Sequence, residues 1–186
     1  MKAKARVSGM FGGSLVAGTG VSSGGRPRGR FLVECYGADG RLKWREDFHN
    51  LITEEAEDDL LSVHLAGGTQ TTTWFVGLKN TGAPAAGDTM ASHVSWTENV
   101  TYSDATRRTW TPGAVAAGSV DNSAARATFN MNGTTTIFGA FLTSNNTKSG
   151  TTGKLYAVGN FASSRAVENG DQLLVTYTAL MADDGV

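Results

Sequence analysis

Residues 31–48 read FLVECYGADGRLKWREDF, and this stretch decides the fold. Two runs of strand-forming residues, 31–36 and 42–48, flank Gly37-Ala38-Asp39-Gly40, a composition typical of a tight turn. In the second run, mostly apolar residues alternate with charged ones, which indicates a strand with one buried face. The stretch therefore predicts an antiparallel β-hairpin.

The rest of the chain repeats this pattern of short strands and turns. The Asn132-Gly133 pair is typical of a tight turn between two strands, and the last run has apolar residues on both sides, which predicts a central place in a sheet. The expected strands span residues 72–78, 94–98, 108–111, 125–131, 135–143, 154–161 and 172–180. About nine strands predict a mainly β protein, an antiparallel β-sandwich of jelly-roll-like form.

One segment favours a helix instead. Residues 53–65 read TEEAEDDLLSVHL. Thr53 is a good N-cap, and the acidic residues of the first turn lie at the positive end of the helix dipole. Ala66-Gly67-Gly68 should end the helix. The sequence therefore predicts one short α-helix within the β-sandwich.

Charge divides the chain into two parts. The first thirty residues contain six basic residues and no acid: Lys2, Lys4, Arg6, Arg26, Arg28 and Arg30. The remaining residues contain ten basic and seventeen acidic residues, a formal charge of −7. Residues 1–29 are rich in glycine and lack hydrophobic periodicity, so we expect an extended basic N-terminal arm. The folded body should span residues 30–186.

An acid-free arm beside an acidic body predicts an acidic partner for the arm. Nucleic acid, a neighbouring copy of the body and the acidic surface of another protein all satisfy that requirement. The arm lacks the interleaved aromatic residues that stack on bases, so we do not expect direct nucleic-acid binding. Its apolar pairs, Met10-Phe11 and Leu15-Val16, are candidate anchors on a partner's surface.

Nothing in the sequence assembles a catalytic or cofactor site. Cys35 is alone, so neither an internal disulfide nor a cysteine metal site is expected. The acidic residues 54–59 are explained by the helix dipole, and no two histidines have the spacing of a zinc-binding helix. No run approaches the ~18 apolar residues of a membrane-spanning helix, so we expect no membrane association. The prediction is a non-enzymatic protein without cofactor or metal.

Three of the four tryptophans lie between residues 74 and 110, together with Arg107-Arg108. Tryptophan, tyrosine and arginine dominate protein interfaces. We therefore predict a contact surface for another protein or for a sister subunit. This region and the arm with its anchor Phe11 would form that surface together. The alternative is that the tryptophans are core residues and the arginines are solvated. The predicted contact residues of this region are Trp96, Tyr102, Arg107, Arg108 and Trp110.

The order of motifs resembles a known family. The motifs are the "DGRLKW" turn, "NLIT" before the helix, "GGTQTTTWFVGLKNTGAPAAGDTMASHVSWTE", "RRTW", "ARATFNMNGTTTIFGAFL" and the closing "VENGDQLLVTYT". They are similar to a family of tailed-bacteriophage virion structural proteins, small proteins that accompany the major capsid protein. The resemblance covers roughly residues 31–180, leaves the arm outside, and rests on structural rather than catalytic motifs.

The resemblance implies a capsid decoration or cement protein, often a homotrimer. Such a protein would be made in the bacterial host cytoplasm and reside on the capsid surface of the virion. Its partners would be the major capsid protein and its own sister subunits. The alternative is a tail-fibre module that binds a receptor or carbohydrate, in which exposed tryptophans would stack on sugar rings.

Overall fold

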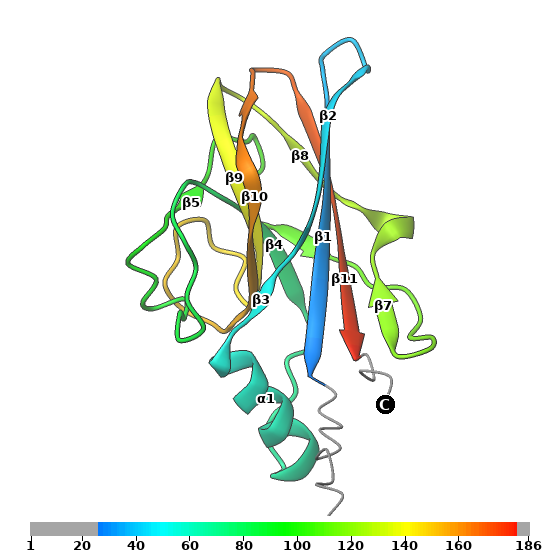
Figure 1. Cartoon of the computed structure of the whole chain (residues 1–186), viewed down its shortest axis with the longest axis vertical. Helices are drawn as coiled ribbons and strands as arrows, with labels where there is room; N and C mark the ends of the chain where they lie inside the picture. Colours follow the sequence, from blue (N-terminus) through cyan, green and yellow to red (C-terminus); the bar gives the residue numbers. More distant parts are fainter. Residues whose placement is uncertain (1–25, 182–186) are drawn as a thin grey trace, which may run out of the picture.

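The computed structural model describes residues 26–181, which form two antiparallel β-sheets packed face to face with one α-helix at one end (Figure 1). The elements are β1 (Pro27–Tyr36), β2 (Leu42–His49), β3 (Leu51–Ile52), α1 (Glu54–Leu65), β4 (Trp74–Lys79), β5 (Glu98–Asn99), β6 (Arg108–Trp110), β7 (Ser119–Asp121), the 3₁₀ turn η1 (Ser123–Ala125), β8 (Ala127–Asn130), β9 (Thr135–Thr143), β10 (Leu155–Val167) and β11 (Gln172–Met181). The predicted mainly β sandwich with one short helix is confirmed.

The first sheet is built around the two ends of the described chain. Its order is β2-β1-β11-β7, and β8 pairs with the other half of β11. β1 and β11 run antiparallel over their full lengths, from Pro27 opposite Met181 to Tyr36 opposite Gln172. The hairpin predicted for residues 31–48 is confirmed, with β1 and β2 as its strands. Gly40 in its turn has a φ of 77°, a conformation that glycine adopts without strain.

The second sheet has the order β3-β10-β9-β4-β5, with β6 also paired to β4. Its centre is the long β9–β10 hairpin, and β10 carries a register shift between Asn160 and Arg165. Gly139 lies where β9 meets β10 most closely, since a Cβ atom there would come within 1.9 Å of the Gly159 carbonyl oxygen. Glycine at this position is therefore a requirement of strand packing.

The core lies between the sheets and follows from strand alternation. In β1, Phe31, Val33 and Cys35 are fully buried, while the residues between them are partly or fully exposed. In β11, Leu173, Val175 and Tyr177 lie directly opposite these three residues and belong to the same buried cluster. Inward-facing residues of both sheets interdigitate in this way, which is the packing expected of a sandwich. The central position predicted for the last strand is confirmed by its place between β1 and β7.

Helix α1 matches its predicted limits. Thr53 caps it, accepting a hydrogen bond from the Ala56 amide at 3.2 Å, and also donates to the Leu155 carbonyl oxygen of β10. The chain leaves the helix through Ala66 and Gly67, whose φ is 72°. Among residues 26–181, no helix is long and apolar enough to cross a membrane.

Several details differ from the sequence predictions: β3 and β7 were not predicted, and β10 extends beyond the predicted residues 154–161. β1 begins at Pro27, so the last residues assigned to the arm belong to the first sheet. The Asn132-Gly133 pair does not close a hairpin, because β8 lies in the first sheet and β9 in the second. The strand predicted at residues 94–98 is mostly loop, and only Glu98–Asn99 pairs as β5. Turn-forming residues specify a change of direction but not whether the next strand stays in the same sheet.

Candidate functional site

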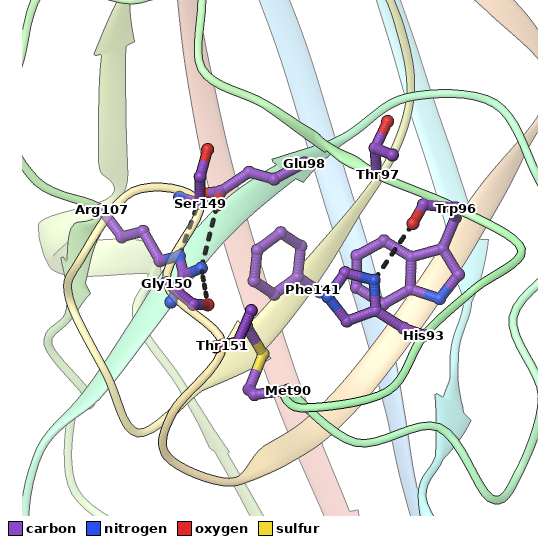
Figure 2. Close-up of a pocket in the computed structure, with 10 residues that line it drawn as sticks. All are labelled: Met90, His93, Trp96, Thr97, Glu98, Arg107, Phe141, Ser149, Gly150 and Thr151. Atoms are coloured by element: carbon purple, nitrogen blue, oxygen red, sulfur yellow. Dashed lines mark hydrogen bonds and ion pairs between the residues drawn. The ribbon is translucent and has the colours of Figure 1, made fainter.

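A pocket lies beside β4 and β5, where two long loops meet the second sheet (Figure 2). Its volume is about 220 Å³. The loop between β4 and β5 supplies one wall, and the loop between β9 and β10 supplies the other. The lining residues are Met90, His93, Trp96, Thr97, Glu98, Arg107, Phe141, Ser149, Gly150 and Thr151.

A buried ion pair forms one side of this pocket. The Arg107 guanidinium donates from Nε and Nη2 to the two carboxylate oxygens of Glu98, each at 2.9 Å. The side chains are only 1% and 5% exposed. This two-pronged geometry matches the planar guanidinium to the planar carboxylate and is the strong form of such a pair. Figure 2 shows the pair beside the ring of Phe141, whose centre lies 5.2 Å from the guanidinium carbon.

Backbone groups complete the coordination of both charges. Arg107 donates to the carbonyl oxygens of Asn145 at 2.8 Å and Gly150 at 3.1 Å, and Glu98 accepts from the Ser149 amide at 2.7 Å. These partners all belong to the loop between β9 and β10. The ion pair therefore ties that loop to β5, and burial of both charges is compensated by hydrogen bonds.

An aromatic stack forms the opposite side of the pocket. The rings of His93 and Trp96 are stacked with centroids 4.1 Å apart and planes 20° apart. His93 Nδ1 donates to the Trp96 carbonyl oxygen at 3.0 Å, and Trp96 Nε1 donates to the Asp88 carboxylate at 2.8 Å. Trp96 is 2% exposed and also contacts Phe141. His93 covers the indole, so this tryptophan offers no open face to a ligand.

Lys79 is a second buried cation close to this stack. Its ammonium group donates to the Asn80 carbonyl oxygen at 2.9 Å and to the Gly82 carbonyl oxygen, and it lies 5.6 Å from the centre of the Trp96 ring. Burial lowers the pKa of Lys79 to about 8, opposed by attraction to Asp88. Carbonyl dipoles and an aromatic face thus replace a direct carboxylate partner.

The charged groups of this arrangement hold loops in place. Each charged group at the pocket is already engaged by a partner of opposite charge or by backbone. Residues 26–181 contain no group of three or more His, Cys, Asp or Glu side chains placed to hold a metal ion. Cys35 is free and buried, and burial together with the Asp171 carboxylate raises the pKa of its thiol to about 12. The thiol is therefore in its unreactive form at neutral pH.

Most of the predicted aromatic contact residues are core residues. Trp96, Tyr102 and Trp110 are 2%, 1% and 9% exposed, and Arg107 is 2% exposed. In the single chain these side chains are therefore part of the core, as the alternative had it for the tryptophans, and they offer little surface for a contact. Trp110 donates from Nε1 to the Tyr177 carbonyl oxygen at 3.1 Å across the core, and the tryptophan polar atom thereby gains its partner without solvent.

The structure places the predicted basic contact residues in different environments. Arg108 remains partly exposed and pairs with Asp104 at 2.6 Å. Arg28 and Arg30 lie exposed on β1, where Arg30 pairs with Asp47 of β2. Arg26 is exposed at the first described position. The remaining predicted contact residues lie outside the described residues: Lys2, Lys4, Arg6 and Phe11.

Sequence reasoning missed the partners and the burial at this site. Glu98 was not singled out, although it is the carboxylate that makes burial of Arg107 possible. Lys79 follows apolar residues in β4, and strand alternation would place its side chain on the exposed face of the sheet. The burial pattern of β4 is continuous from Val76 to Lys79 because both of its faces are covered. Only the lack of alternation in residues 74–78 could have indicated this.

Comparisons with known proteins add no family. The chain matches no protein-family model, and no curated protein sequence is significantly similar to it. What the resemblance to phage structural proteins implies about function is therefore a proposal.

Proposed function

We propose that this chain is a non-enzymatic virion structural protein that decorates the outside of a phage capsid. It binds the major capsid protein and sister subunits, as a homotrimer, and bridges neighbouring capsomers. Many copies that each bury surface across capsomer seams oppose opening of the shell, because opening loses those contacts. On this proposal the protein resides on the capsid surface.

One observation carries the proposal: the separation of charge along the chain. The first thirty residues are basic and free of acids, and the remainder has a formal charge of −7. The described part of the basic segment, Arg26 to Arg30, lies at the start of β1 next to α1. A positive attachment segment at one end of a negative, closely packed body suits a protein that attaches to an acidic assembly.

The state of the body agrees with a structural role. The charges of the pocket beside β4 and β5 neutralise each other and fasten the loop between β9 and β10 to β5. A rigid sandwich loses little conformational entropy on attachment, so more of its contact energy appears as binding. The resemblance of residues 31–180 to phage structural proteins points to the same class.

The test is occupancy of capsids assembled without this protein. Residues 27–186 and the full chain are mixed with such capsids, and bound protein is measured by gel densitometry. We expect the shortened protein to remain folded and to occupy capsids at least tenfold less at the same concentration. Full occupancy by the shortened protein would remove residues 1–26 from the attachment mechanism, and no occupancy by the full chain would refute capsid decoration.

A matched charge control separates position from net charge. The variant Lys2→Gln/Lys4→Gln and the variant Arg41→Gln/Arg45→Gln each remove two positive charges. The second pair is exposed near the β1–β2 turn, away from the N-terminal segment. The first variant should weaken binding mainly at low salt, since screening removes most of the exposed charge effect at physiological ionic strength. Equal loss in both variants would indicate a net-charge effect only.

The carbohydrate-binding alternative has one observation in its favour. Trp74 and Tyr156 are half-buried, with ring centres 5.2 Å apart, and line a pocket of about 190 Å³ between α1 and the sandwich. Asp59 and Gln70 add polar groups there. Aromatic faces with polar neighbours suit a sugar ring. Quenching of tryptophan fluorescence by host-surface polysaccharide, lost in Trp74→Ala, would favour this function over decoration.

A further inference from the structure

An apolar groove lies at the end of the sandwich where the described chain begins. It is formed between α1, the first residues of β1 and the last residue of β11, and its volume is about 260 Å³. The lining residues are Arg26, Pro27, Glu57, Leu60, Leu61 and Met181. Three of the six side chains are large and aliphatic, and charge is limited to Arg26 and Glu57.

The apolar side chains of this region are unusually exposed. Leu61 and Met181 are each 59% exposed, and Leu65, one turn further along α1, is 81% exposed. Ala56 is the one residue of α1 that is fully buried against the sandwich. A surface helix normally turns its apolar stripe toward the core. Here part of that stripe is left without a partner in residues 26–181.

We propose that residues 10–16 of the same chain dock in this groove. The described chain begins at Arg26 and Pro27, which line the groove themselves, so the preceding residues start beside it. Residues 10–16 read MFGGSLV, and they contain two apolar pairs separated by Gly12, Gly13 and Ser14. An apolar groove and a segment with two apolar pairs are complementary in chemistry.

The connection is long enough and has the residues needed to turn back. Nine residues, 17–25, separate the docking segment from Arg26, and a fully extended connection of that length spans about 30 Å. Four of them are glycine, including Gly24-Gly25 directly before Arg26 in the sequence. Glycine permits a reversal of direction without steric cost.

Charge does not oppose this occupant. Glu54 and Asp58 are exposed on α1, and Glu57 lies at the groove. The first thirty residues contain no acid, so nothing in the segment is repelled by this helix. Covalent attachment gives the segment an effective concentration on the order of millimolar, so contacts too weak for a separate peptide suffice.

Docking of residues 10–16 has a consequence for residues 1–9. The end of this segment that joins residue 10 would be fixed to the body. Lys2, Lys4 and Arg6 would then project from a defined place next to α1. Less entropy would then be lost when they meet a partner. This inference concerns the free protein, and its test is independent of whether the partner is a capsid.

The test is the rate of chymotrypsin cleavage between residues 10 and 16 in the full chain, read by mass spectrometry. Phe11 and Leu15 are cleavage sites within the docking segment. Leu61→Glu places a charge in the groove, and Leu42→Glu is the matched control at a residue that is 52% exposed at the start of β2. We expect Leu61→Glu to accelerate cleavage at least tenfold and Leu42→Glu to leave it unchanged. Equal rates in Leu61→Glu and the natural sequence would overturn the proposal.

A second measurement tests whether the groove is covered in the free protein. In Leu61→Cys the introduced thiol reports access, since Cys35 is buried. Phe11→Asp added to this variant should increase its rate of maleimide labelling at least fivefold, and Val100→Cys, exposed on the loop after β5, should show no change. The protection should be the same over a hundredfold range of protein concentration. Protection that increases with concentration would assign the groove to a second copy and overturn docking of the chain's own segment.

Discussion

Two regions of the molecule reverse the usual distribution of side chains. At the loops beside β5, the charged side chains of Glu98, Arg107 and Lys79 are buried. At the other region, around α1, Leu61 and Leu65 are exposed. Figure 1 places α1 at one end of the sandwich, and the loops around β5 lie along its flank.

The two reversals have different physical explanations. The buried charges have partners within the chain: a carboxylate with its guanidinium, backbone amides and backbone carbonyls. The exposed leucines belong to neither of the two buried hydrophobic clusters of the described residues. Burial of polar groups with partners indicates internal structure, whereas an apolar patch without partners indicates binding. The candidate for interaction is therefore the α1 region, although the other region also contains a pocket.

The sharpest test of this contrast is to break the buried ion pair. Arg107→Met leaves Glu98 buried without its counter-charge, so the free energy of unfolding should fall by about 3–5 kcal/mol. Urea denaturation measures the loss. The matched control is Arg108→Met, whose salt bridge to Asp104 is partly exposed at 39% and 25% of the side chains. That variant should lose only about 0–1 kcal/mol.

The double variant separates charge from packing. Adding Glu98→Gln to Arg107→Met removes the uncompensated charge and should recover part of the lost stability. If the double variant is less stable than the single by the full cost of Glu98→Gln alone, the two side chains act independently. That result would contradict the interpretation of this region as a coupled internal pair.

The next test concerns Lys79 and pH. Burial lowers its pKa from 10.5 to about 8 in the folded protein. Between these values the unfolded chain binds the proton and the folded chain does not, so the contribution of Lys79 to stability rises with pH. Relative to Lys79→Met, the natural protein should gain about 1 kcal/mol in free energy of unfolding between pH 7.5 and 9.

Using the difference between the two proteins cancels other titrations. The pKa of the Cys35 thiol is raised to about 12 by burial and Asp171, which makes stability fall as pH rises above 9 in both proteins. Urea denaturation curves of the natural protein and of Lys79→Met at four pH values measure this difference in the free energy of unfolding. A pH-independent difference would mean that Lys79 is hydrated in the folded state and that the buried-charge description of this region is incomplete.

The smallest expected effect is at α1. Leu65 is 81% exposed and does not line the groove. Leu65→Lys should change the free energy of unfolding by less than about 0.5 kcal/mol, because most of this side chain is already exposed to solvent. Thermal or urea denaturation measures it. A loss above 2 kcal/mol would show that this leucine is covered in the folded protein and would remove the contrast between the two regions.

Much of the architecture could be predicted from local signals. The turn at residues 37–40, the cap at Thr53, and strands 135–143 and 172–180 were predicted close to their observed limits. These signals depend on alternation, turn chemistry and capping, which act within a few residues. The candidate site could not be predicted equally well, because burial of Trp96, Tyr102 and Arg107 depends on loops that are distant in sequence.

The sequence by itself determined that this is a mainly β protein with one capped helix and a division between a basic beginning and an acidic remainder. Periodicity and composition suffice for these properties because each is local or additive. Only the tertiary structure decided which charges are buried, which strands share a sheet, and which apolar residues remain without a partner. Glu98 and Arg107 pair across nine positions, and the loop that completes their burial lies about forty residues further on. Such contacts exist only after the two sheets have packed, so no local pattern specifies them.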